Sequence, residues 1–291
     1  MSGYLDIHCH GGGGHAFGDT DAGTRAAFSA HHTHGTEHVV ASLVSLRLDD
    51  LERAMDVIRV AMAHQSGIVG VHLEGPFLAP ERRGAHDPGA LAEPTPELVA
   101  DILDIVGDDL RQITIAPELP GAMDAIRAFS SAGVVVAVGH TMADSGTTAA
   151  AFEAGASLLT HAFNAMAGIG ARAPGPVGAA IANPLAYIEV IADGIHVDPT
   201  IIRTLFAVAP ERIVLVTDAM AAAGSAPGRY RLGSLEVDVT GDGRAVLAGT
   251  DTLAGSTLTL DRAVEVCVGA GVPRELAEAA ANANPRRLMG L

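Results

Sequence analysis

The stretch QITIAPELPGAMDAIRAFSSAGVVVAVGH, residues 112–140, holds two short apolar runs on either side of a segment with helical spacing. The β-branched runs at 112–118 and 134–140 predict strands, and 120–133 predicts an amphipathic helix that ends at a glycine. A strand, a helix and a second strand in this order are typical of a βαβ unit with parallel strands. The stretch therefore indicates an α/β fold.

The same alternation extends outward over most of the chain. We expect eight strands, at residues 4–8, 38–44, 67–74, 112–118, 134–140, 157–164, 187–194 and 212–219. Eight strands that are apolar on both faces and separated by helices predict a closed (β/α)8 barrel of the TIM type. A doubly wound open sheet is the alternative.

Residues 228–251 break this rhythm. They alternate at period 2 around a TGDG turn, which predicts a β-hairpin or meander inserted after the eighth strand. Two helices, at 256–271 and 273–288, should follow it. We expect one domain over residues 1–291.

Composition narrows the function classes. The formal net charge of −16 argues against a nucleic-acid binder, which needs a basic face, but it permits a small anionic substrate. Two cysteines, Cys9 and Cys267, do not make a disulfide framework, which suits the cytoplasm. No apolar run approaches the roughly 20 residues that cross a bilayer, and no signal peptide is evident. We expect a cytoplasmic enzyme without a membrane partner.

The predicted strands end in side chains suited to metal ligation, and a barrel builds its active site at this end. Period 2 places His8 and His10 on one side of the first strand, with Cys9 facing away. A single strand-end histidine is usually an ordinary hydrogen-bonding residue, but here six such groups come from five strands. Imidazoles and carboxylates together suit Zn²⁺ or Fe²⁺, with Mn²⁺ or Co²⁺ as alternatives. The set predicts one divalent ion or a bridged pair, and its members are His8, His10, Glu74, His140, His161 and Asp218.

Seven motifs along the chain make this pattern more specific. They are DIHCHGGGG, GVHLEGPF, VGHTMAD, THAFNAM, ADGIHV, VTDAM and TLAGS, in this order. Together, over residues 3–291, they resemble the N-acetylglucosamine-6-phosphate deacetylases of the amidohydrolase superfamily. The resemblance implies hydrolysis of the acetamide of N-acetylglucosamine 6-phosphate to glucosamine 6-phosphate and acetate, a step of amino-sugar catabolism.

The resemblance also implies roles for individual residues. Glu74, His140 and His161 match the metal ligands that all members share, and His8 and His10 match those of members that hold a second ion. Asp218 matches the catalytic aspartate, which takes a proton from water and delivers it to the leaving amine. In relatives an arginine reaches across a dimer interface, so we expect a homodimer. The residues matching substrate contacts are Asn164, Ala165, Arg172, His196, His86 and Leu253.

Other expectations concern the remaining histidines and the glycines. We expect His31 and His32 on the surface, at the barrel end opposite the ligands. Residues 11–14, four glycines, should form a sharp turn after the ligands rather than a phosphate-binding loop, because no Lys-Ser/Thr pair follows.

The resemblance leaves alternatives. Relatives carry flanking segments that form a small β-sandwich, and these are missing from the 291 residues. We therefore expect an apolar patch near 228–251 and lower solubility or activity than in a form with both flanks. Another amidohydrolase, such as a cyclic-amide hydrolase or a deaminase, a metal-dependent phosphoesterase, and a truncated non-catalytic barrel are the rival interpretations.

Overall fold

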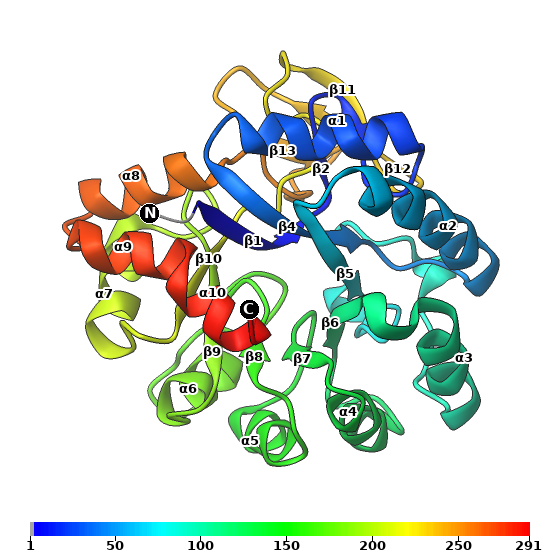
Figure 1. Ribbon diagram of the computed structural model, residues 1–291. Coiled ribbons are helices and arrows are strands. Elements are labelled where there is room, and N and C mark those ends of the chain that lie inside the picture. Colours follow the sequence, from blue (N-terminus) through cyan, green and yellow to red (C-terminus); the bar gives the residue numbers. More distant parts are fainter. Residues whose placement is uncertain (1–2) are drawn as a thin grey trace.

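The computed structural model describes residues 3–291 and contains an eight-stranded parallel sheet whose strands are ringed by helices (Figure 1). The ring closes where Cys9 pairs with Ala219 and the Asp218 N–H donates to the His8 carbonyl at 2.8 Å. This confirms the predicted (β/α)8 barrel and excludes the open sheet. In ring order the strands are β1 (Tyr4–Cys9), β4 (Thr36–Leu43), β5 (Ile68–Glu74), β6 (Leu110–Ile115), β7 (Val135–Val138), β8 (Leu158–Leu159), β9 (Tyr187–Ile191) and β10 (Ile213–Val216).

Helices follow the strands in turn and cover the outside of the barrel (Figure 1). The unit over 112–140 is β6, α4 and β7, as predicted, and α4 stops before Gly133, whose φ of 81° only glycine adopts readily. The helices are α1 (Asp21–His32), α2 (Leu48–His64), α3 (Pro96–Val106), α4 (Ala122–Ser131), α5 (Ser145–Glu153), α6 (Gly175–Ala182), α7 (Pro199–Val208), α8 (Leu260–Gly269), α9 (Arg274–Ala281) and α10 (Ala283–Met289).

The prediction of a single helix over 273–288 is wrong. The structure has two helices there, α9 and α10, which meet at Asn282. Pro285 lacks an N–H and cannot donate to the Ala281 carbonyl, so a continuous helix would lose a hydrogen bond there. The Asn282 side chain instead donates to the Gly3 carbonyl at 2.7 Å, which ties the break to the start of β1.

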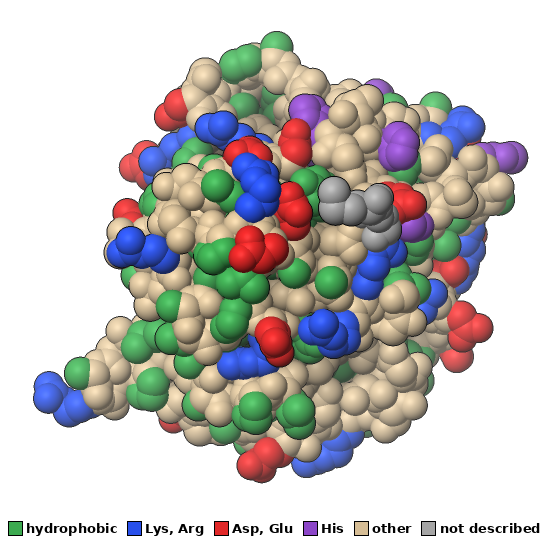
Figure 2. Space-filling view, turned by 60° about the vertical axis from the view of Figure 1, so that its left-hand side comes forward, with side chains coloured by type: hydrophobic (Ala, Val, Ile, Leu, Met, Phe, Trp, Pro, Cys, Tyr) green, Lys and Arg blue, Asp and Glu red, His purple; other side chains and the backbone are tan. Residues whose placement is uncertain are grey.

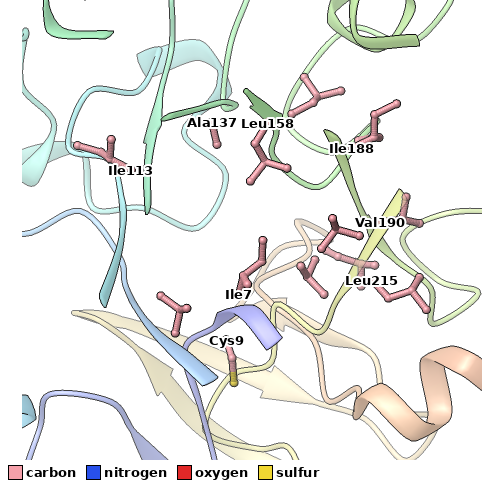
Figure 3. Packing of buried hydrophobic residues seen from close by; sticks show 14 of the residues in the cluster. Ile7, Cys9, Ile113, Ala137, Leu158, Ile188, Val190 and Leu215 are labelled. Atoms are coloured by element: carbon pink, nitrogen blue, oxygen red, sulfur yellow. The ribbon is translucent and has the colours of Figure 1, made fainter. Parts of the chain in front are cut away.

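The buried core lies mainly between the strands and the helices. Figure 3 shows part of it, with Ile7, Ile113, Ile188 and Leu215 coming from four different strands. The expectation that both strand faces are apolar is wrong for the inner face near the carboxyl ends of the strands. There His72 hydrogen-bonds Thr114 at 2.9 Å, so polar groups fill the barrel beneath the site.

The segment after β10 forms a three-stranded antiparallel sheet of β11 (Gly228–Leu232), β12 (Leu235–Val239) and β13 (Ala245–Leu247). Of the two forms expected, the structure has the meander, and residues 240–243 turn the chain between β12 and β13. Leu232 and Val237 pack on Ala85 and Met220 in a small second core. This sheet therefore holds the loop after β5 beside the barrel rim.

The four glycines turn the chain as expected. Gly11–Gly12 (β2) pairs with His15–Ala16 (β3), and between them Gly13 and Gly14 have φ of 60° and 88°. A side chain on Gly11 would place its Cβ 2.3 Å from the His15 carbonyl oxygen.

Charged side chains of both signs lie on the molecular surface (Figure 2). On the face shown in Figure 2, acidic and basic side chains are interspersed. Within residues 3–291, no helix combines the length and apolarity needed to cross a membrane.

Candidate metal and catalytic site

Six side chains predicted from the strand ends lie together at the carboxyl end of the barrel. Their ligand atoms form two groups, each within 4.8 Å, and Glu74 belongs to both. One group is His8, His10, Glu74 and Asp218, and the other is Glu74, His140 and His161. All six side chains are buried. The sequence rule for barrel active sites therefore predicted a set of side chains that the structure brings together.

Glu74 lies between the two groups and contacts members of both. Its Oε1 is 3.0 Å from Nε2 of both His140 and His161, and its Oε2 is 3.2 Å from Nε2 of His10. A carboxylate in this position can contribute oxygens to both groups.

The hydrogen bonds behind the histidines fix which nitrogen faces inward. Nδ1 of His140 lies 2.7 Å from the Arg82 carbonyl oxygen, which can only accept, so Nδ1 carries the hydrogen. In the neutral ring the Nε2 lone pair then points at Glu74 Oε1 and at Nε2 of His161, 3.0 Å away. Such electron-rich atoms at this spacing call for a cation among them. The residues present therefore fit a divalent metal with nitrogen and oxygen ligands.

The first group shows the same pattern. Nδ1 of His8 lies 3.0 Å from Glu189 Oε2, which leaves His8 Nε2 facing His10 Nε2 at 3.2 Å. Burial opposes protonation of His8, but the carboxylates of Glu74, Glu189 and Asp218 outweigh it and raise its pKa well above the usual value. This corner of the barrel attracts positive charge.

The ligands leave their strands through unusual backbone geometry. His140 and Asp218 both have φ of 47°, a region that costs a non-glycine residue about 1–3 kcal/mol. β7 and β10 accordingly end at Val138 and Val216, two residues before these side chains, so the predicted strands at 134–140 and 212–219 were too long. The predicted strands at 157–164 and 187–194 are also shortened, to β8 and β9.

Sequence reasoning missed Glu189, a fully buried carboxylate inside the barrel. Its Oε2 accepts from His8 Nδ1 and, at 3.1 Å, from the His161 backbone N–H, while Oε1 accepts from Gln112 Nε2 at 2.8 Å. A carboxylate behind a metal-binding imidazole fixes the ring and raises its basicity. The available signal was a lone acidic residue inside the apolar run YIEVIADG.

Most of the expected substrate contacts line a cavity of ≈ 70 Å³ above the ligands, namely Asn164, Ala165, His196, His86 and Leu253. His196 Nδ1 lies 2.7 Å from Asp193 Oδ2, which fixes its ring. His86 is buried, with Nε2 3.2 Å from Glu74 Oε2 and Nδ1 2.9 Å from Ser45 Oγ. Arg172 is exposed on the loop before α6 and is not among the residues lining this cavity.

The expectation for His31 is wrong, whereas His32 is exposed as expected. His31 is fully buried, and its Nε2 lies 2.9 Å from the Gly11 carbonyl oxygen, next to the ligands. Gly12 makes this approach feasible, because a Cβ there would sit 2.9 Å from that nitrogen. Burial lowers the pKa of His31.

The sequence is similar to those of known sugar-phosphate deacetylases. No family model matches the sequence. The N-acetylglucosamine-6-phosphate deacetylase of Bos taurus is 38% identical over 303 residues, covering 99% of this chain and 74% of the relative. An N-acetylgalactosamine-6-phosphate deacetylase of Escherichia coli O157:H7 is 37% identical over 295 residues, covering 99% and 77%.

Solved structures give the same result. A mutant of the N-acetyl-D-glucosamine-6-phosphate deacetylase of Mycobacterium smegmatis, in complex with N-acetyl-D-glucosamine-6-phosphate, superposes with a TM-score of 0.96 at 44% identity. The match covers 100% of this chain and 78% of that one. The Pasteurella multocida enzyme of the same name has a TM-score of 0.93 at 29% identity, covering 99% and 76%. With this fold, these ligands and these relatives, the chain belongs to the N-acetylglucosamine-6-phosphate deacetylase family.

Proposed function

We propose that this chain hydrolyses the acetamide of N-acetylglucosamine 6-phosphate. Water adds to the amide carbonyl, the C–N bond breaks, and glucosamine 6-phosphate and acetate leave. The observation that carries the proposal is the position of Asp218, whose Oδ1 lies 3.3 Å from His10 Nε2 and 3.5 Å from His8 Nε2, at the edge of the two ligand groups. An acid beside a metal centre is what amide hydrolysis needs.

Glu74, His140 and His161 would hold one divalent cation, and His8, His10, Glu74 and Asp218 would hold a second. Zn²⁺ and Fe²⁺ suit these ligands, with Mn²⁺ and Co²⁺ as alternatives. When bound, the cation polarises the amide carbonyl and lowers the pKa of water. The two groups share Glu74, which supports a bridged pair.

Asp218 moves the proton in this scheme. Burial opposes its ionisation, but the His8 charge and the hydrogen bond from His10 lower its pKa below the usual range. It therefore starts as a carboxylate, accepts the proton of the attacking water and delivers that proton to the departing amine. Its backbone is held by the Asp218 N–H to His8 carbonyl bond and by the Ser256 N–H, which donates to the Asp218 carbonyl at 2.7 Å.

The sugar phosphate is held on the side of β8 and β9. Asn164 and the backbone of Ala165 follow β8, and His196 follows β9, with its outward nitrogen set by Asp193. In a homodimer, Arg172 of the partner subunit would complete the phosphate site. The planar guanidinium group of arginine can donate two hydrogen bonds to the oxygens of a phosphate.

A product assay tests this function. The purified chain, loaded with Zn²⁺, should release acetate from N-acetylglucosamine 6-phosphate in proportion to the amine formed, and release no inorganic phosphate. N-acetylgalactosamine 6-phosphate belongs in the same panel, because one relative is named for it. Phosphate release without acetate would overturn the proposal in favour of a phosphoesterase.

A further inference from the structure

A second cavity, of ≈ 600 Å³, lies beside the catalytic one. His10, Ala85 and Leu232 line both cavities, so the two adjoin at a candidate metal ligand. The volume falls within the range of about 300–1,000 Å³ that is typical of small-molecule sites. The mechanism above gives this space no role.

The second cavity lies across the barrel from the phosphate contacts. Its lining includes Ser42–Arg47, which covers the end of β4 and the loop after it. The phosphate contacts Asn164 and Ala165 follow β8. In the closed ring, three strands separate β4 from β8 in either direction, so these two loops face each other over the site.

This arrangement decides where the acyl part of the substrate points. When the amide carbonyl lies at the ligand groups, its carbon carries the sugar nitrogen on one side and the alkyl part of the acyl group on the other. With the sugar phosphate toward β8 and β9, the alkyl part of the acyl group would point toward His10, Ala85 and Leu232, where the two cavities adjoin. We propose that the second cavity receives the N-acyl group, so that the chain hydrolyses N-acyl glucosamine 6-phosphates with acyl chains longer than acetyl. This inference rests on the proposed function.

The lining of the second cavity suits an alkyl chain. Phe17, Val44, Val57 and Leu232 contribute apolar surface. Charged groups come from the start of α2, where Arg53 and Asp50 form an ion pair. Burial of methylene groups against the apolar part is favourable, and the charged part can face water or a polar chain end.

A hydrogen bond also joins the two cavities. Ser45 lines the second cavity, and its Oγ holds His86 Nδ1 at 2.9 Å, while His86 lines the catalytic cavity and contacts Glu74. The reaction itself is unchanged: water adds, the C–N bond breaks, and the longer carboxylate leaves in place of acetate.

The first test compares acyl chains on the same sugar. kcat/KM of the Zn²⁺-loaded chain is measured for the N-acetyl, N-propionyl and N-butyryl forms of glucosamine 6-phosphate. If the pocket were closed behind the acetyl group, each added methylene would lower kcat/KM by about 10–200-fold. We expect the N-butyryl value to stay within about tenfold of the N-acetyl value, and a fall of about a hundredfold or more overturns the inference. If the N-acetyl compound itself is not hydrolysed, the proposed function fails instead.

The second test fills the cavity from α2. Val57→Phe places a ring at a residue that lines the second cavity but not the catalytic one. Val60→Phe, the matched control, makes the same change on the same helix at a side chain that is 50% exposed. We expect Val57→Phe to lower kcat/KM for N-butyryl by about tenfold or more with N-acetyl within about twofold, and Val60→Phe to change neither. Equal losses for both substrates in Val57→Phe, at an unchanged melting temperature, would mean that the sugar phosphate occupies the cavity and would overturn the inference.

Discussion

The imidazole of His8 donates from Nδ1 to the carboxylate of Glu189 across 3.0 Å, and both side chains are completely buried. The bond turns His8 Nε2 toward Glu74 and Asp218, at 3.4 and 3.5 Å. Glu189 belongs to neither group of candidate ligands at the site and does not line the catalytic cavity. It is a positioning residue, and its loss should lower the affinity of the site for a metal ion.

Glu189→Gln keeps the shape of the side chain but removes its charge. We expect the affinity for the ion at His8 and His10 to fall by about 10–100-fold, as is usual when a carboxylate behind a metal-binding histidine is lost. Competition with a chelator measures this affinity directly. Glu211→Gln, at an exposed position before β10, is the control and should bind metal like the parent chain. Unchanged affinity in Glu189→Gln would remove the positioning role.

Asp218→Asn tests the proton transfer. Five other ligand side chains remain, so metal content should be retained, while kcat should fall by about 10²–10⁴-fold because an amide cannot accept and return the proton. Elemental analysis and an acetate assay on the same sample check both statements. Near-normal turnover would rule out the role assigned to Asp218.

Asp193→Asn tests the phosphate side of the site. Burial opposes ionisation of Asp193, but its hydrogen bond with His196 lowers its pKa, so the carboxylate persists at neutral pH. Loss of this charge-assisted bond should raise KM for the phosphorylated sugar by about tenfold, with little change in kcat. N-acetylglucosamine without the phosphate is the control substrate. Equal effects on both substrates would place His196 away from the phosphate.

His31 should make stability depend on pH. Burial lowers its pKa in the folded chain, whereas in the unfolded chain it takes up a proton near the ordinary value of about 6.5. The unfolded state therefore binds more protons below about pH 6.5, and the free energy of unfolding falls as pH drops through that value toward the lowered folded pKa. Above about pH 7 this contribution to stability is fully present.

His31→Gln removes that titration and keeps a donor for the Gly11 carbonyl. The difference in metal-free melting temperature between about pH 7.5 and pH 5.5 should then be smaller than in the parent chain. His32→Gln, at the exposed neighbour, should leave the difference unchanged. If both variants behave alike, His31 is not the responsible group.

Hydrophobic periodicity predicted the barrel, because it depends on local sequence pattern. The six candidate ligands followed from one further rule, that side chains at the carboxyl ends of barrel strands form the active site. Neither the periodicity nor this rule could predict how far each strand runs. His140 and Asp218 adopt left-handed backbone geometry, which ends β7 and β10 early and depends on hydrogen bonds from distant loops.

The missed positions also depend on tertiary contacts. Glu189 is 181 residues from His8 in the sequence, and the pairing exists only once β9 and β1 belong to one ring. His31 is buried because α1 packs on the glycine segment after β1, which the helical pattern of α1 does not reveal.

The bond between the Asp218 N–H and the His8 carbonyl joins the first strand of the barrel to the last. The possible metal ligands His8, His10 and Asp218 thus come from the two ends of the ring and meet only when the ring closes. A nascent polypeptide still on the ribosome lacks this set of ligands until residue 218 has emerged and docked. Metal binding there would require the closed ring, and it would stabilise the seam by mass action.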